Sequence, residues 1–206
     1  DMSSGRSAVL DQTLVKLLKD LRRSLAQQKN VPPFVIFQEP SLEDMATQYP
    51  ISMDDMTKIT GVSLGKAKRY GKQFISLIAD YVEENDIERP TDFVVKQVAN
   101  KSKVKVNIIQ SVDRKIPLHD IASANNLDME ELYHEMDMIV ASGTKVDINY
   151  YIDDNVDEYS REDIYEYFME SDSDSVDEAF EELQEDDIMM EEIQLMRIKF
   201  LSEMAN

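Results

Sequence analysis

The sequence predicts a mainly α-helical protein, and three observations carry this prediction. Apolar residues recur at helical spacing in several segments, most clearly from Val9 to Gln28. Only five Gly and six Pro occur among 206 residues, which argues against a loop-rich β protein. N-cap motifs, in which a Ser or Asp is followed three residues later by an acid, precede several of these segments.

The first part of the chain is expected to be a helical unit over residues 1–86. Leucines between Leu10 and Leu25 share one face of a long first helix, and Pro32 and Pro33 follow its end. The expected N-caps of the helices that follow are Ser41, Ser52 and Ser63. A polar linker over residues 85–90 closes this unit.

Residues 91–152 have the spacing of a helix-turn-helix with a small wing. Its second helix is expected from Asp128 to Ser142, with Asp128 as its N-cap. Apolar residues then alternate along residues 145–152, which predicts a strand as the wing. Residues 153–206 are expected to form an acidic helical tail. Two of its helices have the expected N-caps Ser160 and Ser175.

Charge divides the chain unevenly. The net charge is -20, but residues 1–115 hold 18 Lys/Arg against 15 Asp/Glu, a net of +3. Residues 116–206 hold 4 Lys/Arg against 27 Asp/Glu, a net of -23. The densest acidic run, residues 153–192, is either a set of solvated helix faces or a surface that mimics the charge of DNA. In the second case it would compete for a basic patch of the same chain or bind a basic protein partner.

Several chemistries find no support in the sequence. Without cysteine there is no disulfide and no thiolate site. The run Gly61–Ala67 is one residue short of a nucleotide-binding P-loop and has Ala where Ser or Thr would hold magnesium. His119 and His134 lie on different expected helices and have no Ser nucleophile near them in the sequence, which argues against a catalytic triad. Acidic runs at 153–157 and 172–174 lack the Gly and Glu that complete a calcium loop. We therefore expect no catalytic site, metal or cofactor in this chain.

No stretch of about 18 apolar residues predicts a membrane span. The first residues also lack the apolar core of a signal peptide. Together with the absence of cysteine, this favours the cytoplasm, in association with the nucleoid. Because position 1 is Asp1 and not Met, we expect a fragment of a longer chain.

A nucleic-acid-binding site is expected within residues 1–84. Phe34 follows two prolines, and an exposed ring there could stack on a base for about 1–3 kcal/mol. Beyond Gly61 and Gly65, the start of a helix would attract phosphate, with basic side chains adding charge. The candidate residues are Phe34, Lys66, Lys68, Arg69, Lys72, Lys19, Arg22 and Arg23. The plainer alternatives are a Phe34 inside the core and a merely solvated basic face on the first helix.

Three motifs in register resemble an HRDC domain, the helicase and ribonuclease D C-terminal domain. They are Val31-Pro-Pro-Phe-Val-Ile-Phe37, Leu42-Glu-Asp-Met-Ala46 and Gly61-Val-Ser-Leu-Gly-Lys-Ala-Lys-Arg-Tyr-Gly71, and the likeness covers about residues 8–84. The resemblance implies a five-helix bundle that binds single-stranded or branched DNA weakly. In bacterial RecQ helicases the aromatic residue after Pro-Pro contributes to DNA binding, and that role maps onto Phe34, where Phe replaces the common Tyr. Residues 91–152 are similar to the helix-turn-helix module that follows HRDC in some of those helicases.

This resemblance implies a non-catalytic accessory region of a RecQ-type DNA helicase that positions single-stranded or branched DNA in repair and recombination. ATP and magnesium would then bind only a motor domain outside this chain. Two alternatives stay open: the same module on a ribonuclease D-like enzyme, binding RNA, and a protein-interaction adaptor. The helix-turn-helix is expected to act as a scaffold or protein contact, because residues 128–142 carry five acids and no Lys or Arg.

Overall fold

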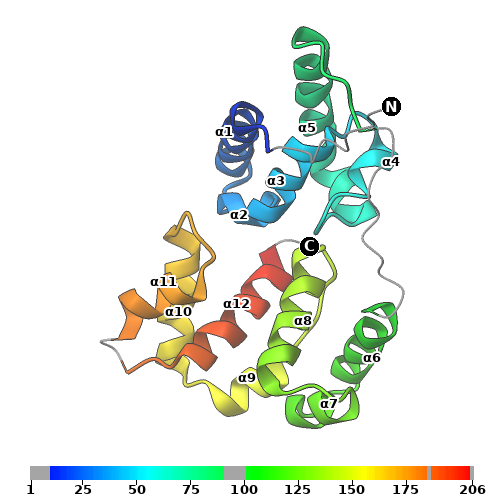
Figure 1. Cartoon of the computed structure of the whole chain (residues 1–206). Coiled ribbons are helices and arrows are strands. Elements are labelled where there is room, and N and C mark those ends of the chain that lie inside the picture. Colours follow the sequence, from blue (N-terminus) through cyan, green and yellow to red (C-terminus); the bar gives the residue numbers. More distant parts are fainter. Residues whose placement is uncertain (1–9, 91–100, 185–186, 205–206) are drawn as a thin grey trace.

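The structure is a computed structural model that describes residues 10–90, 101–184 and 187–204, and its described residues form helices without a strand (Figure 1). The helices before residue 90 are α1 (Gln12–Lys29), α2 (Pro33–Ile36), α3 (Glu39–Gln48), α4 (Met53–Met56) and α5 (Leu64–Glu84). Those after residue 100 are α6 (Lys101–Asp113), α7 (Leu118–Ala124), α8 (Met129–Ala141), α9 (Asn149–Asn155), α10 (Glu158–Glu170), α11 (Val176–Leu183) and α12 (Met190–Met204). The expected mainly α fold, with five helices in its first part, is confirmed.

Helices α1 to α5 enclose their own hydrophobic core. Leu14, Leu18 and Leu25 form the buried face of α1, as the leucine spacing predicts. Asp11 caps this helix by accepting hydrogen bonds from the backbone N–H groups of its first turn. The helix ends at Asn30, whose left-handed backbone turns the chain toward the two prolines.

Most of the expected helix starts are confirmed, and two are displaced. Ser52, Ser63 and Ser175 each accept a hydrogen bond from the N–H group three residues on, and Asp128 forms a complete capping box. Ser41 is not an N-cap, because α3 begins two residues earlier and the buried Ser41 hydroxyl donates to the carbonyl of Thr60 at 2.8 Å. Ser160 lies inside α10, since Asp157 takes the capping role.

The expected wing over residues 145–152 is wrong. Residues 144–148 form no regular element and α9 follows them, while the buried side chains of Val146, Ile148 and Ile152 join the core built around α12 instead of a sheet. The Ser202 hydroxyl donates to the Val146 carbonyl at 2.6 Å and accepts from the Val146 N–H at 2.9 Å. These are the backbone groups that a neighbouring strand would have used. The segment is therefore fixed by one buried side chain.

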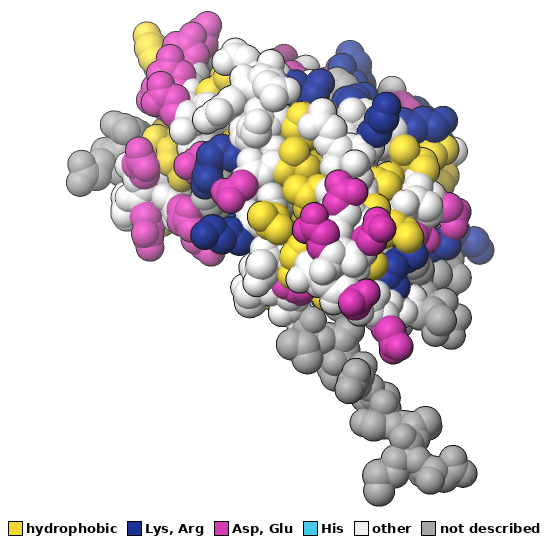
Figure 2. Space-filling model, turned by 90° about the horizontal axis from the view of Figure 1, so that it is seen from above, with side chains coloured by type: hydrophobic (Ala, Val, Ile, Leu, Met, Phe, Trp, Pro, Cys, Tyr) yellow, Lys and Arg dark blue, Asp and Glu magenta, His cyan; other side chains and the backbone are white. Residues whose placement is uncertain are grey.

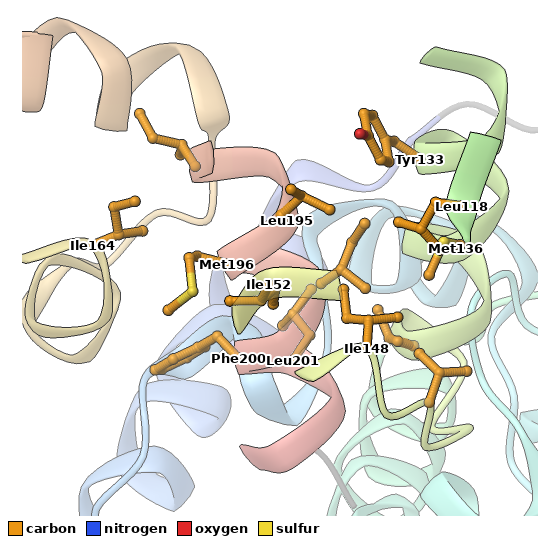
Figure 3. Packing of buried hydrophobic residues seen from close by; sticks show 14 of the residues in the cluster. Leu118, Tyr133, Met136, Ile148, Ile152, Ile164, Leu195, Met196, Phe200 and Leu201 are labelled. Carbon is orange, nitrogen blue, oxygen red and sulfur yellow. The ribbon is translucent and has the colours of Figure 1, made fainter. Parts of the chain in front are cut away.

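Helix α12 is the centre of the C-terminal part (Figures 1 and 3). It packs against α8, α9, α10 and α11, so residues 102–152 and the acidic tail share one hydrophobic core. Figure 3 shows Leu195, Met196, Phe200 and Leu201 of α12 directed toward side chains from several neighbouring helices. Most acidic residues of these helices are exposed, whereas the inner faces of the helices are apolar. None of the described helices has the length and apolar character to cross a membrane.

The run from Val31 to Phe37 belongs to both cores. Ile36 and Phe37 are buried in the core of α1 to α5, whereas Phe34 and Val35 are buried in the core built around α12. Helix α2 therefore joins the two halves of the molecule, and the tertiary contacts of these aromatic and aliphatic side chains set how the halves meet.

Candidate nucleic-acid interface

The start of α5 is built by a sharp turn that only glycine accommodates well. Gly61 has a positive φ of 72°, and a Cβ atom at this position would lie 3.0 Å from the Ser41 hydroxyl. Ser63 then caps the helix through the N–H of Lys66 at 3.2 Å. Two further backbone N–H groups of the first turn, those of Leu64 and Gly65, have no helical carbonyl before them and give this end of the helix its positive potential.

One exposed face of α5 gathers a glycine and three cations. Gly65, Lys68, Arg69 and Lys72 are all exposed. At 100° per residue they lie within an arc of roughly 100° on the side of the helix opposite its buried residues. Residues 61–79 contain no Asp or Glu. Within the described part of the chain, neither Lys68 nor Lys72 forms an ion pair. We call Gly65, Lys68, Arg69 and Lys72 the α5 basic face.

A further cation lies beside this face and was missed in the sequence. The ammonium of Lys29, in the last turn of α1, lies 5.6 Å from the centre of the Tyr70 ring, and the Arg69 guanidinium lies 5.8 Å from the same ring. The sequence feature that could have indicated it is the position of Lys29 in the last turn of α1, just before the Pro-Pro segment, since α1 packs against α5. Tyr70 itself is buried and serves as the platform between the two cations.

Lys66 does not belong to this face, so its expected exposure is wrong. Its side chain is buried, and its Nζ donates to the backbone carbonyl of Ala141 at 3.0 Å. Ala141 is the last residue of α8, whose carbonyl end carries negative partial charge. Burial lowers the pKa of Lys66 to about 8; the nearby carboxylate of Asp174 acts against this shift and Arg69 adds to it. The ammonium is turned toward the C-terminal half.

The expected exposure of Phe34 is also wrong. The ring is 3% exposed and lies 6.0 Å, centre to centre, from the ring of Phe200 on α12. The Pro-Pro segment does hold the ring in a fixed direction, but that direction is into the core of the C-terminal half. In this arrangement neither Phe34 nor Lys66 is open to a nucleic-acid strand.

The basic arc of α1 is largely engaged within the protein. Arg22 is buried, and its guanidinium donates to the Phe37 carbonyl at 2.8 Å and pairs with Glu39 at 2.5 Å. Lys19 pairs with the other oxygen of Glu39 at 2.7 Å. Burial alone would raise the pKa of Glu39, but the hydrogen bonds from Lys19 and Arg22 outweigh it and hold that pKa below its usual value. Arg23 is exposed and lies 3.5 Å from Asp20. An exposed role for Arg22 is thus excluded in this arrangement.

Positive charge on the upper face of the molecule is dispersed. Figure 2 shows Lys and Arg side chains around the edge of a hydrophobic band, with Asp and Glu side chains among them. No single large basic patch covers that view. Attraction of a phosphate chain would therefore come from local clusters such as the α5 basic face.

The helix-turn-helix offers no comparable surface on its second helix. Tyr133 of α8 is buried toward α12, and its hydroxyl donates to Glu191 at 2.6 Å. Asp137 accepts from Gln194 at 2.5 Å and pairs with Arg197, while burial raises its pKa against the effect of that arginine. Helix α8 therefore packs against α12 through these side chains. Among the described residues, no His, Asp and Glu side chains cluster as a metal site would require.

Comparison with known families finds a matching segment in each half of the chain. Residues 11–78 match the HRDC domain family, and residues 102–152 match the RecQ-1-like helix-turn-helix domain. The chain carries an HRDC domain and a RecQ-1-like helix-turn-helix domain. Both are accessory, non-catalytic regions of RecQ helicases. The HRDC domain corresponds to the bundle of α1 to α5, so the α5 basic face lies on it.

Named relatives of this chain are helicases. It is 35% identical over 71 residues to the ATP-dependent DNA helicase RecQ of Haemophilus influenzae, which covers 34% of this chain and 12% of that protein. The RecQ of Bacillus subtilis is 33% identical over 73 residues, 35% of this chain and 12% of that protein. The ATP-dependent helicase wrn-1 of Caenorhabditis elegans is 25% identical over 151 residues, 68% of this chain and 14% of that protein. The chain thus spans only a small part of the length of these relatives.

Proposed function

We propose that this chain is the accessory region of a RecQ-type DNA helicase and that its HRDC domain binds single-stranded or branched DNA through the α5 basic face, with Lys29 beside it. ATP hydrolysis, and the magnesium it needs, would belong to a motor domain of the same helicase. The role would be to position DNA during repair and recombination.

The observation that carries this proposal is the concentration of cations at the start of α5. Lys68, Arg69 and Lys72 stand on one exposed arc in a stretch of chain without a carboxylate. Gly65 lies in the middle of that arc, and the nearest atom to a Cβ built there is 3.9 Å away, so a phosphate backbone can approach the first turn closely. Such contacts are indifferent to base sequence and weaken steeply with salt.

The test is a titration of fluorescently labelled oligothymidylate with the whole chain at several salt concentrations, read by anisotropy. The double variant Lys68→Ala/Lys72→Ala should weaken binding. It should also lower the slope of log affinity against log salt by about 1.4, since each contact with a single strand contributes about 0.7.

A matched control removes two other exposed lysines. Lys103→Ala/Lys115→Ala makes the same change in net charge on α6 and just after it, outside the HRDC domain, and should leave the affinity nearly unchanged. Equal losses in both double variants would show a nonspecific charge effect and reject the assigned face. Tighter binding to oligouridylate than to oligothymidylate would favour the ribonuclease-type parent, and binding to neither would favour an adaptor.

A further inference from the structure

The surface on which the HRDC domain meets the C-terminal helices holds two of the groups that the sequence marks for nucleic acid. Phe34 enters the core around α12. Lys66 donates to the carbonyl end of α8. Lys66 lies on the buried side of α5, the helix that carries the α5 basic face, and Phe34 lies on α2, which packs against α1.

A third contact crosses the same surface. The side-chain amide of Gln38, the N-cap residue of α3, donates to Asp174 at 2.6 Å. Asp174 is held in place by Arg197, which pairs with its carboxylate at 2.6 Å and donates to its carbonyl at 2.6 Å. The acidic tail therefore presents one oriented carboxylate to the HRDC domain close to the buried ammonium of Lys66, as the effect of Asp174 on the pKa of Lys66 also shows.

A groove borders the contact. Its volume is about 370 Å³, and it separates the end of α1 and the Pro-Pro segment from the end of α10, with Arg23 and Asn30 on one wall and Glu170 and Asp172 on the other. Domains of one chain commonly move relative to one another. At this contact the Lys66 ammonium faces the uncharged carbonyl of Ala141, which offsets little of the free-energy cost of removing the ammonium from water.

We infer that the docked arrangement is a closed state of the HRDC domain in which the C-terminal helices occupy Phe34 and Lys66 in place of nucleic acid. Release of helices α8 to α12 would expose the Phe34 ring on α2 and the Lys66 ammonium on α5, and so add two groups to those that can contact a strand. A nucleic-acid strand would then shift the chain toward the open state because it makes contacts that only the open state allows. This inference rests on the proposed function.

Gln38→Glu is the variant that should shift the chain from the closed state to the open state. It places a second carboxylate opposite Asp174 and should repel the C-terminal half, while the new acid at the start of α3 is favourable to that helix. The added negative charge alone would weaken DNA binding, so tighter binding cannot arise from charge. Gln28→Glu, on an exposed position of α1, adds the same charge without the contact and is the matched control.

The opening itself can be measured by spin labels. The chain has no cysteine, so Gln28→Cys together with Tyr159→Cys places one label on α1 and one on the highly exposed start of α10. Pulsed electron–electron double resonance then measures the distance between the two labels, and so between the two halves, with and without saturating oligothymidylate. The same label pair is combined with Gln38→Glu.

We expect oligothymidylate to lengthen or broaden the distance distribution and Gln38→Glu to do so without DNA. Opening should tighten oligothymidylate binding severalfold, because the open state adds contacts to those that the α5 basic face already makes. A distance distribution that saturating DNA leaves unchanged overturns the inference, as does a Gln38→Glu variant that opens without any gain in affinity. If neither the parent chain nor the opened variant binds DNA, the proposed function itself has failed.

Discussion

The ring of Phe34 packs against the ring of Phe200, although the two residues lie in different halves of the chain. One belongs to the short helix after the Pro-Pro segment of the HRDC domain, and the other to the helix at the centre of the C-terminal core. An aromatic residue that the sequence marks for base stacking is thereby a structural contact in this arrangement. Substitution of Phe34 would therefore change the stability of the fold as well as any binding of DNA.

Phe34→Ala should lower the free energy of unfolding by about 3 kcal/mol or more, as buried Phe-to-Ala changes do when they leave a cavity. Urea denaturation followed by circular dichroism measures this. Tyr159→Ala is the control, because the Tyr159 side chain is 81% exposed and its removal should cost less than about 0.5 kcal/mol. A Phe34 variant of unchanged stability would mean that the ring is not buried in solution.

Arg22 and Lys19 pair with the same carboxylate but should differ in their effect on stability. Arg22→Ala removes a buried guanidinium and leaves the Phe37 carbonyl without its donor, which should cost about 2 kcal/mol. Lys19→Ala breaks an exposed pair and should cost less than about 1 kcal/mol. Urea denaturation of the two variants tests the difference. Equal costs would contradict the structural role of Arg22.

Gly61 and Gly65 also differ in what a methyl group would do. Gly61→Ala forces a left-handed backbone on alanine and brings its Cβ to 3.0 Å from the Ser41 hydroxyl, so it should cost at least about 1 kcal/mol. Gly65→Ala brings its Cβ no closer than an ordinary contact of 3.9 Å with the Ser63 hydroxyl, so within a helix it should be neutral or stabilise by up to about 1 kcal/mol. Thermal unfolding of both variants decides between them. Destabilisation by Gly65→Ala equal to that by Gly61→Ala would reject this account of the turn.

The pKa of Lys66 makes stability depend on pH. It is about 8 in the folded chain, below the value of about 10.4 expected when the chain is unfolded. Between these values the unfolded chain holds the proton and the folded chain does not, so the free energy of unfolding should rise as the pH increases from about 8 to about 10. Below pH 8 both states hold the proton, and this contribution is flat.

Lys66→Met isolates this effect. Urea denaturation at pH 7.5 and pH 9.5 should show the parent chain gaining stability relative to the Met variant, whose side chain does not titrate. The comparison cancels other groups, such as Tyr49 and Tyr150, whose pKa values burial raises to about 12. Parallel curves for the two proteins would show that Lys66 is solvated in solution.

The sequence predicted what local chemistry decides. The capping box of Asp128 and Glu131 and the cap at Ser63 lie where their motifs place them, because the partners are three residues apart. Ser41 failed because Pro40 suits the first turn of a helix and lets α3 begin before it. The HRDC resemblance predicted that the bundle has five helices, a number that the local sequence patterns alone did not give.

What the sequence could not supply are contacts between distant residues. Four alternating residues from Val146 to Ile152 fit a strand, but the Ser202 hydroxyl, far along the chain, binds the Val146 backbone and no strand lies beside it among the described residues. The exposure of Phe34 and Lys66 depended in the same way on Phe200 and Ala141, which carry no local signal of a partner. Tertiary contacts decided each of these cases.

The seven residues from Val31 to Phe37 send their side chains into two separate hydrophobic cores within two turns of backbone. Unfolding of either core would remove the packing of part of α2 and so destabilise the other core. Calorimetry of the intact chain should therefore show a single heat-absorption peak in which both halves melt together, and Phe34→Ala should split it into two.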